Sequence, residues 1–214
     1  MSLLMPPVAW RAAPRPLAFV LGTLVCLASC VPKNQYDAAV AEFEKVANSH
    51  PDDPFAVNHL LNAVLFRELY RVGALDTSLY SSNSFVTKKK FEIDPAVKQR
   101  VAELMTRAMD LSEERLKADP NDVQALYTRG ITRGLRATYL DLVDKAWFAV
   151  LRSAVGARHD HEEVLEMVPD FADAKTIVGA HNYVAGSLPW AVKAAAAIVG
   201  LSGSKQKGLE YLSA

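Results

Sequence analysis

Cysteine is scarce in this sequence, and both cysteines lie near its start. The chain of 214 residues contains Cys26 and Cys30 and no other cysteine. So small a number excludes a fold held together by several disulfides and a zinc site built from cysteines. Glycine and proline number only 10 and 11, which excludes collagen-like and low-complexity sequence.

An excess of charge of either sign is also absent. Lys and Arg total 24 and Asp and Glu total 24, so the formal net charge at pH 7 is zero. Balanced charge argues against a broad basic face, and we therefore expect no nucleic-acid partner. Half of the residues are hydrophobic, which predicts a chain that folds around a core as one domain or a short repeat array.

The sequence lacks the motifs of the common enzyme classes. It has no G-x-S-x-G nucleophile, no P-loop, no dinucleotide fingerprint and no H-E-x-x-H. We therefore expect no enzyme, no catalytic residue and no cofactor. The densest group of metal-type ligands is residues 159–163, but His159 and His161 cannot share a face of a helix. We interpret this group as a solvated helix segment without a metal; a metal-dependent enzyme at the two histidines remains an alternative.

The first thirty residues have the pattern of an export signal. Arg11 and Arg15 are the only charged residues before Cys30, and residues 17–29 form a mostly apolar run. That run is too short to cross a bilayer, which takes about 20 residues. A basic start, a short apolar run and small residues at its end predict a signal peptide over residues 1–29.

The end of the apolar run resembles the bacterial lipobox, with the sequence LASC at residues 27–30. In lipoproteins the Cys is lipidated and becomes the first residue of the mature chain. The resemblance implies that Cys30 is lipidated, that residues 30–34 form a tether and that lipid holds the protein at a membrane. Val31 replaces the Asp that commonly retains lipoproteins in the inner membrane, so we expect the outer membrane, facing the periplasm. An ordinary cleaved signal and an uncleaved anchor remain open.

The rest of the chain shows helical spacing. After Cys30 we find no sustained apolar–polar alternation and no Asn-Gly or Asp-Gly hairpin turn. Apolar residues instead recur at spacings of three and four in residues 36–46, 60–69 and 104–116. We therefore predict an all-α fold over residues 35–214.

Three prolines, Pro51, Pro120 and Pro169, anchor a repeated pattern. An alanine stands twelve residues before each proline and another stands five residues after it, and Gly130 and Gly179 follow the last two by ten residues. A proline ends one helix and permits the first turn of the next, and small residues let two helices approach closely. The pattern therefore predicts helix–turn–helix units that contact one another through their small residues.

This pattern resembles the tetratricopeptide repeat (TPR), a helix–turn–helix unit that stacks into an α-solenoid. Residues 36–54 resemble its second helix and closing turn, and residues 118–130 and 169–186 each resemble a closing turn and the first helix of the next unit. Residues 203–212 resemble the start of a further second helix, which implies a partial sequence or a short final helix. The resemblance implies a binding scaffold, because such repeats mostly bind proteins or peptides.

The spacing of the prolines departs from the family. They are 69 and 49 residues apart, against about 34 for the family unit. We expect the extra residues to form a loop at 73–93, and inserted helices or lengthened first helices at 139–156 and 187–201. Three lysines at 88–90 lie in the expected loop, where they meet either solvent or an acidic surface.

Candidate binding residues lie on the expected first helices, which line the concave groove in this family. Basic side chains there hold a carboxylate or another acidic group of a partner. The resemblance implies a partner-binding set of Tyr127, Arg129, Arg133, Arg136, His181, Asn182, Tyr183 and Trp190. Ion pairing of the three arginines, with Asp141, Asp144 or a Glu-rich helix, remains an alternative. For the apolar stretch that begins at Trp190, a buried helix and a docking surface both remain open.

These observations predict a non-catalytic, lipid-anchored scaffold in the periplasm that binds a protein or peptide partner. A second resemblance leads to an alternative. The T component of periplasmic TRAP-type transporters is a lipoprotein of cryptic repeats that pairs with a solute-binding subunit, so a transporter accessory is the other function to consider.

Overall fold

In a computed structural model of the chain, the structure describes residues 33–76, 90–188, 190–198 and 200–213. All regular secondary structure in these ranges is helical and none of it is a strand, which confirms the all-α prediction. The signal peptide, Cys30 and most of the expected loop at 73–93 lie outside the described residues.

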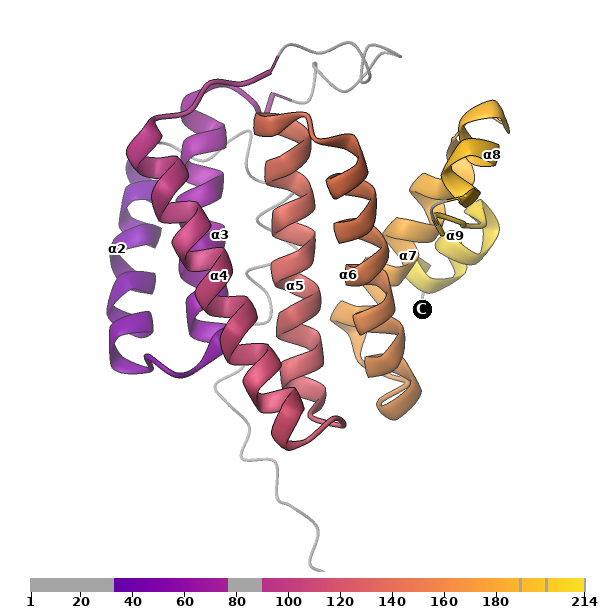
Figure 1. Cartoon of the computed structure of the whole chain (residues 1–214), viewed down its shortest axis with the longest axis horizontal. Coiled ribbons are helices and arrows are strands. Elements are labelled where there is room, and N and C mark those ends of the chain that lie inside the picture. Colours follow the sequence, from indigo (N-terminus) through magenta and orange to yellow (C-terminus); the bar gives the residue numbers. More distant parts are fainter. Residues whose placement is uncertain (1–32, 77–89, 189, 199, 214) are drawn as a thin grey trace, which may run out of the picture.

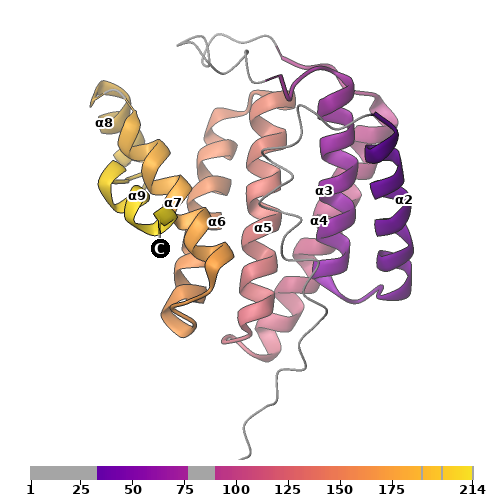
Figure 2. The ribbon, with the colours of Figure 1, turned by 180° about the vertical axis from the view of Figure 1, so that it is seen from behind.

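Helices α2 to α7 form a row in which each helix runs opposite to the one before it (Figure 1). Neighbours in the chain are neighbours in space from α2 to α7; α9 packs on α7, and α3 also contacts α5. Figure 2 shows the same order from behind, with α8 standing beyond α7. The helices are α2 (Lys33–Ser49), α3 (Pro54–Arg71), α4 (Pro95–Ala118), α5 (Val123–Tyr139), the π-helical turn η3 (Leu140–Asp144), α6 (Trp147–Met167), α7 (Ala172–Ser187), α8 (Trp190–Ile198) and α9 (Lys205–Ser213).

The three repeated prolines each lie in a turn between two helices, as the repeated pattern predicts. Acidic residues beside two of these turns cap the helix that follows. The Asp53 carboxylate accepts the Phe55 amide at 2.9 Å, and the Asp122 carboxylate accepts the Ala125 amide at 3.0 Å. Each bond satisfies one of the amides that the first turn of a helix leaves without a partner. The local sequence therefore fixes where α3 and α5 begin.

The small residues of the repeated pattern lie where helices touch. Its alanines on α3, α4, α5, α6 and α7 are buried, and a side chain at either repeated glycine would meet the neighbouring helix. A Cβ on Gly130 would meet the ring of His161, and one on Gly179 would come within 3.0 Å of Tyr211 and Leu212. The prediction that small residues permit close helix contact is confirmed.

The two expected insertions take different forms. Residues 190–198 form the separate helix α8, as predicted. Residues 140–144 lengthen α5 by the π-helical turn, which ends at Asp144 and is followed by Lys145, a residue in the left-handed conformation with φ of 55°. The expectation that the whole of residues 139–156 lengthens a first helix is wrong. Residues 147–156 instead form the first half of α6, which is the second helix of its pair.

Buried side chains form two apolar clusters along the row. The larger cluster joins α2, α3, α4, α5 and η3, and the smaller one, around Leu126 and Val164, joins α5, α6 and α7.

A buried polar contact crosses from α3 to α5. The Asn58 amide nitrogen donates to the Thr128 carbonyl at 2.7 Å, and the Thr132 hydroxyl donates to the Asn58 side-chain oxygen at 2.8 Å. These bonds fix the position of α3 along α5.

Candidate functional site

Tyr127, the first of the predicted binding residues, is a core residue. It is buried between the rings of Phe171 and His161, and its hydroxyl donates to Asp173 at 3.1 Å. Burial, followed by the negative charge of Asp173, raises the pKa of the Tyr127 phenol. The side chain therefore joins α5 to α7 and keeps its proton.

Arg129 and Arg133 both bind the carboxylate of Asp160, which is fully buried on α6. A terminal nitrogen of Arg129 lies 2.6 Å from one Asp160 oxygen, and a terminal nitrogen of Arg133 lies 2.7 Å from both oxygens. The structure therefore pairs these arginines with acidic residues of α6 instead of Asp141 or Asp144: Asp160 binds both, and Glu163 lies 4.0 Å from Arg129. Arg136, one turn further along α5, is exposed.

His161 lies beside this ion pair and faces α5. Its Nδ1 donates to the Ala157 carbonyl at 2.6 Å, which fixes the proton on Nδ1 because a carbonyl only accepts. Nε2 is buried without a hydrogen-bond partner, and burial lowers the pKa of the ring. His159 is exposed and lies 3.5 Å from Glu163. The two histidines thus have different surroundings, and no group of three metal-type ligands occurs among the described residues.

His181, Asn182 and Tyr183 lie on α7 and contact the segment that leads into α9. Asn182 is buried and accepts the Ser204 amide at 3.5 Å. The Lys205 ammonium lies over the Tyr183 ring, 5.4 Å from its centroid. His181 has a lowered pKa because it is half-buried. These side chains hold the start of α9 against α7.

Trp190, at the start of α8, is 84% exposed, and Ile198 at the end of the same helix is 86% exposed. The described side chains between them, including Lys193, are exposed as well. The buried-helix interpretation of this stretch is therefore wrong. Residues 189 and 199, which flank α8, lie outside the described residues.

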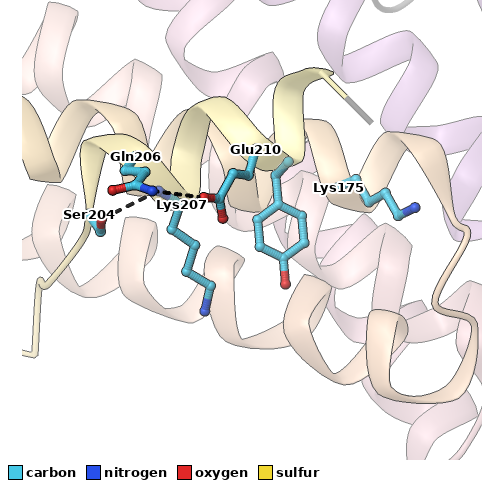
Figure 3. A pocket seen from close by; sticks show the side chains of 6 residues that line it. Lys175, Ser204, Gln206, Lys207 and Glu210 are labelled. Carbon is cyan, nitrogen blue, oxygen red and sulfur yellow. Dashed lines mark hydrogen bonds between the residues drawn. The ribbon is translucent and has the colours of Figure 1, made fainter.

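Sequence reasoning did not identify a pocket between α7 and α9. It has a volume of about 600 Å³ and is lined by Lys175, Ser204, Gln206, Lys207, Glu210 and Tyr211. Figure 3 shows Lys207 and Glu210 on α9 and Lys175 on the neighbouring helix, with Gln206 bonded to Glu210. Lys207 lies 5.8 Å from the centroid of the Tyr211 ring.

The pocket is cationic and partly aromatic. Two ammonium groups stand against one carboxylate, and that carboxylate accepts from the Gln206 amide at 3.2 Å. Lys175 has a carboxylate neighbour at the rim, Asp170, at 3.1 Å. Such a lining suits an acidic or carboxylate-bearing ligand. The sequence does carry a sign of it, because residues 174–209 contain four lysines and no acidic residue.

Close contact between α7 and α9 creates this pocket. A Cβ on Gly208 would meet the backbone of Tyr183, and one on Gly203 would meet the backbone of Asn182. With glycine at both positions, the backbones approach more closely than side chains allow.

No helix in the described part of the chain is both long enough and apolar enough to cross a membrane. No protein-family model matches the sequence, and neither a curated protein nor a solved structure matches it. A function must therefore be argued from the geometry of this chain.

Proposed function

We propose that this protein is a lipid-anchored, TPR-like repeat scaffold of the periplasm that binds a protein or peptide partner without catalysis. One observation carries the proposal: the helices pair in chain order, with turns at the repeated prolines and small residues at the contacts. Arrays of this kind expose extended surfaces on which partners dock. The lipobox at residues 27–30 supplies the anchor.

The pocket between α7 and α9 is the docking site that the geometry favours. Lys175 and Lys207 present positive charge to it, and Tyr211 adds an aromatic wall. An acidic segment or a terminal carboxylate of a partner peptide matches this lining. Arg136 is also exposed and belongs to the proposed partner surface, whereas Arg129 and Arg133 already hold Asp160.

Site-specific photo-crosslinking in membranes tests this proposal. A photoreactive residue replaces Gln206 in the full chain, and the matched control replaces Gln99, because each glutamine bonds to a glutamate four residues later on an exposed helix face. We expect a partner to be captured from position 206 and not from 99. Lys207→Glu should reduce capture, whereas Lys117→Glu, at an exposed position of α4, should not.

Equal capture from both glutamines, or capture that Lys207→Glu leaves unchanged, would contradict docking in this pocket. Mass spectrometry identifies the captured protein. A solute-binding subunit would support the transporter accessory, and an envelope protein would support the scaffold.

A further inference from the structure

Several helix ends gather at one end of the row, which we call the proximal end: the end at which α2, α4 and α6 begin. The ring of Tyr36, near the start of α2, stacks on Tyr70 near the end of α3 with centroids 4.8 Å apart. Lys98, near the start of α4, lies 3.9 Å from Asp144, which ends the π-helical turn before α6. Figures 1 and 2 place α8 at this same end.

The proximal end carries large apolar side chains in contact with solvent. Ile198, Trp190 and Phe148 are the most exposed large hydrophobic side chains of the described residues, at 86%, 84% and 80%. Trp147 is adjacent to Phe148 at the first turn of α6 and is also exposed. Exposed tryptophan and phenylalanine side chains on an apolar helix face are typical of helices that enter the interface of a bilayer.

Positive charge accompanies these side chains, although the whole chain is neutral. Residues 145–159, around Trp147 and Phe148, contain three Lys or Arg residues and no Asp or Glu, and Lys193 is the only charged residue of α8. Arg152 follows Phe148 by one helical turn, and Lys193 follows Trp190 by three residues; both are exposed. Basic residues close to interfacial aromatics are attracted to anionic headgroups.

The position of Cys30 selects which end of the row meets the membrane. Cys30 precedes the first residue of α2, Lys33, by three positions, and three residues span at most about 10 Å. Helix α2 has 17 residues, so its far end lies about 25 Å further away. This step rests on the lipidation of Cys30 in the proposed function. An anchor there holds the proximal end, and not the distal end, against the headgroups.

We propose that the proximal end rests on the lipid surface. Trp147, Phe148, Trp190 and Ile198 enter the interface, and Arg152 and Lys193 meet anionic headgroups. The row of helices then stands upright on the membrane, with the turns at the three repeated prolines facing away from it.

Tryptophan fluorescence tests this orientation, because Trp147 and Trp190 are the only tryptophans after residue 29. The full chain, purified with its lipid, is reconstituted into phosphatidylethanolamine–phosphatidylglycerol vesicles that contain brominated acyl chains. Trp147→Phe leaves Trp190, and Trp190→Phe leaves Trp147. In each variant we expect the brominated chains to quench most of the fluorescence of the remaining tryptophan. The double variant gives the background emission, including that of Trp10 on any chain that keeps residues 1–29.

A tryptophan at the distal end is the matched control. Met167→Trp, in the double variant, places it at the last residue of α6, where the native side chain is 36% exposed. We expect this tryptophan to keep its emission. Equal quenching at both ends, or no quenching at Trp147 and Trp190, would overturn the orientation. Omitting phosphatidylglycerol should weaken quenching; unchanged quenching would overturn the role of Arg152 and Lys193.

Mass spectrometry of the same sample separates this inference from the proposed anchor. Acylated Cys30 with unquenched tryptophans overturns the orientation and supports the anchor. Quenched tryptophans on a chain without an acyl group support the orientation and overturn the anchor. Absence of both overturns both proposals.

Discussion

At the scale of single residues, Gly130 has a role that only its neighbour on α6 explains. A Cβ there would meet the Cε1 and Nδ1 atoms of His161, and this ring cannot move aside easily because it is fully buried and bonded to Ala157. Gly134, one turn further along α5, has nothing within 4 Å of its Cβ position. On the same helix, therefore, one glycine has no room for a side chain and the other has open space beside it.

Alanine substitution should change the free energy of unfolding in opposite directions at the two glycines. Gly134→Ala removes the helix penalty of glycine and should raise the free energy of unfolding by up to about 1 kcal/mol. Gly130→Ala makes the same gain but overpacks the core, which costs about 1–3 kcal/mol, and should lower stability on balance. Urea denaturation of both variants measures the difference. If Gly130→Ala stabilised the protein as much as Gly134→Ala, the close contact would not exist.

Loss of the Asp160 carboxylate should lower the free energy of unfolding strongly. This buried carboxylate pairs with both Arg129 and Arg133, and removing one partner of a buried charge cluster typically costs about 3–5 kcal/mol. We expect Asp160→Asn to lower the unfolding free energy by an amount near that range.

Glu163→Gln is the control for Asp160→Asn. Glu163 is more than one-third exposed and lies 4.0 Å from Arg129, so its loss should cost less than about 1 kcal/mol. Thermal melts of the two variants compare them, and similar shifts would contradict the assigned role of Asp160.

At the scale of elements, α9 depends on glycine for its place on α7. Gly208 faces the backbone of Tyr183, which cannot yield as a flexible side chain does. We expect Gly208→Ala to loosen α9 and to accelerate tryptic cleavage after Lys205 and Lys207 several-fold, because proteolysis follows local opening. Gln206→Ala, on the exposed face of the same helix, should leave the cleavage rate nearly unchanged. Equal rates in both variants would show that α9 is not held by this contact.

At the scale of the whole molecule, three buried or half-buried histidines make stability depend on pH. Burial lowers the pKa of His59, His161 and His181 in the folded chain, whereas the unfolded chain titrates near 6.5. Below that pH the unfolded state binds more protons. The stability from these histidines is therefore full above about pH 6.5 and falls as the pH drops toward the folded-state pKa values.

We expect the unfolding free energy to be lower at pH 5.0 than at pH 7.5, by up to about 1.4 kcal/mol per pH unit for each histidine. His161→Gln should reduce this dependence, since it removes the most buried of the three rings. His159→Gln, at an exposed position, should not. Urea titrations at both pH values check this. A stability that stays constant between pH 7.5 and 5.0 would contradict the prediction.

Local signals made much of the fold predictable. The turns at Pro51, Pro120 and Pro169 depend on proline and on caps such as Asp53 and Asp122, which act within a few residues. The pairing of Arg129 and Arg133 with Asp160 was not predictable, because the partners are 31 and 27 residues apart. The pocket between α7 and α9 was missed for the same reason: its lining comes from two helices separated by α8.

The sequence by itself determined that the described chain is helical, where its helices turn and where its small residues recur, because capping, proline geometry and hydrophobic spacing act over one or two helical turns. Only the tertiary structure decided which charges are paired, which glycine faces a ring and that Trp190 and Ile198 are exposed. Those properties depend on distances between helices, and the packing of the whole row sets these distances.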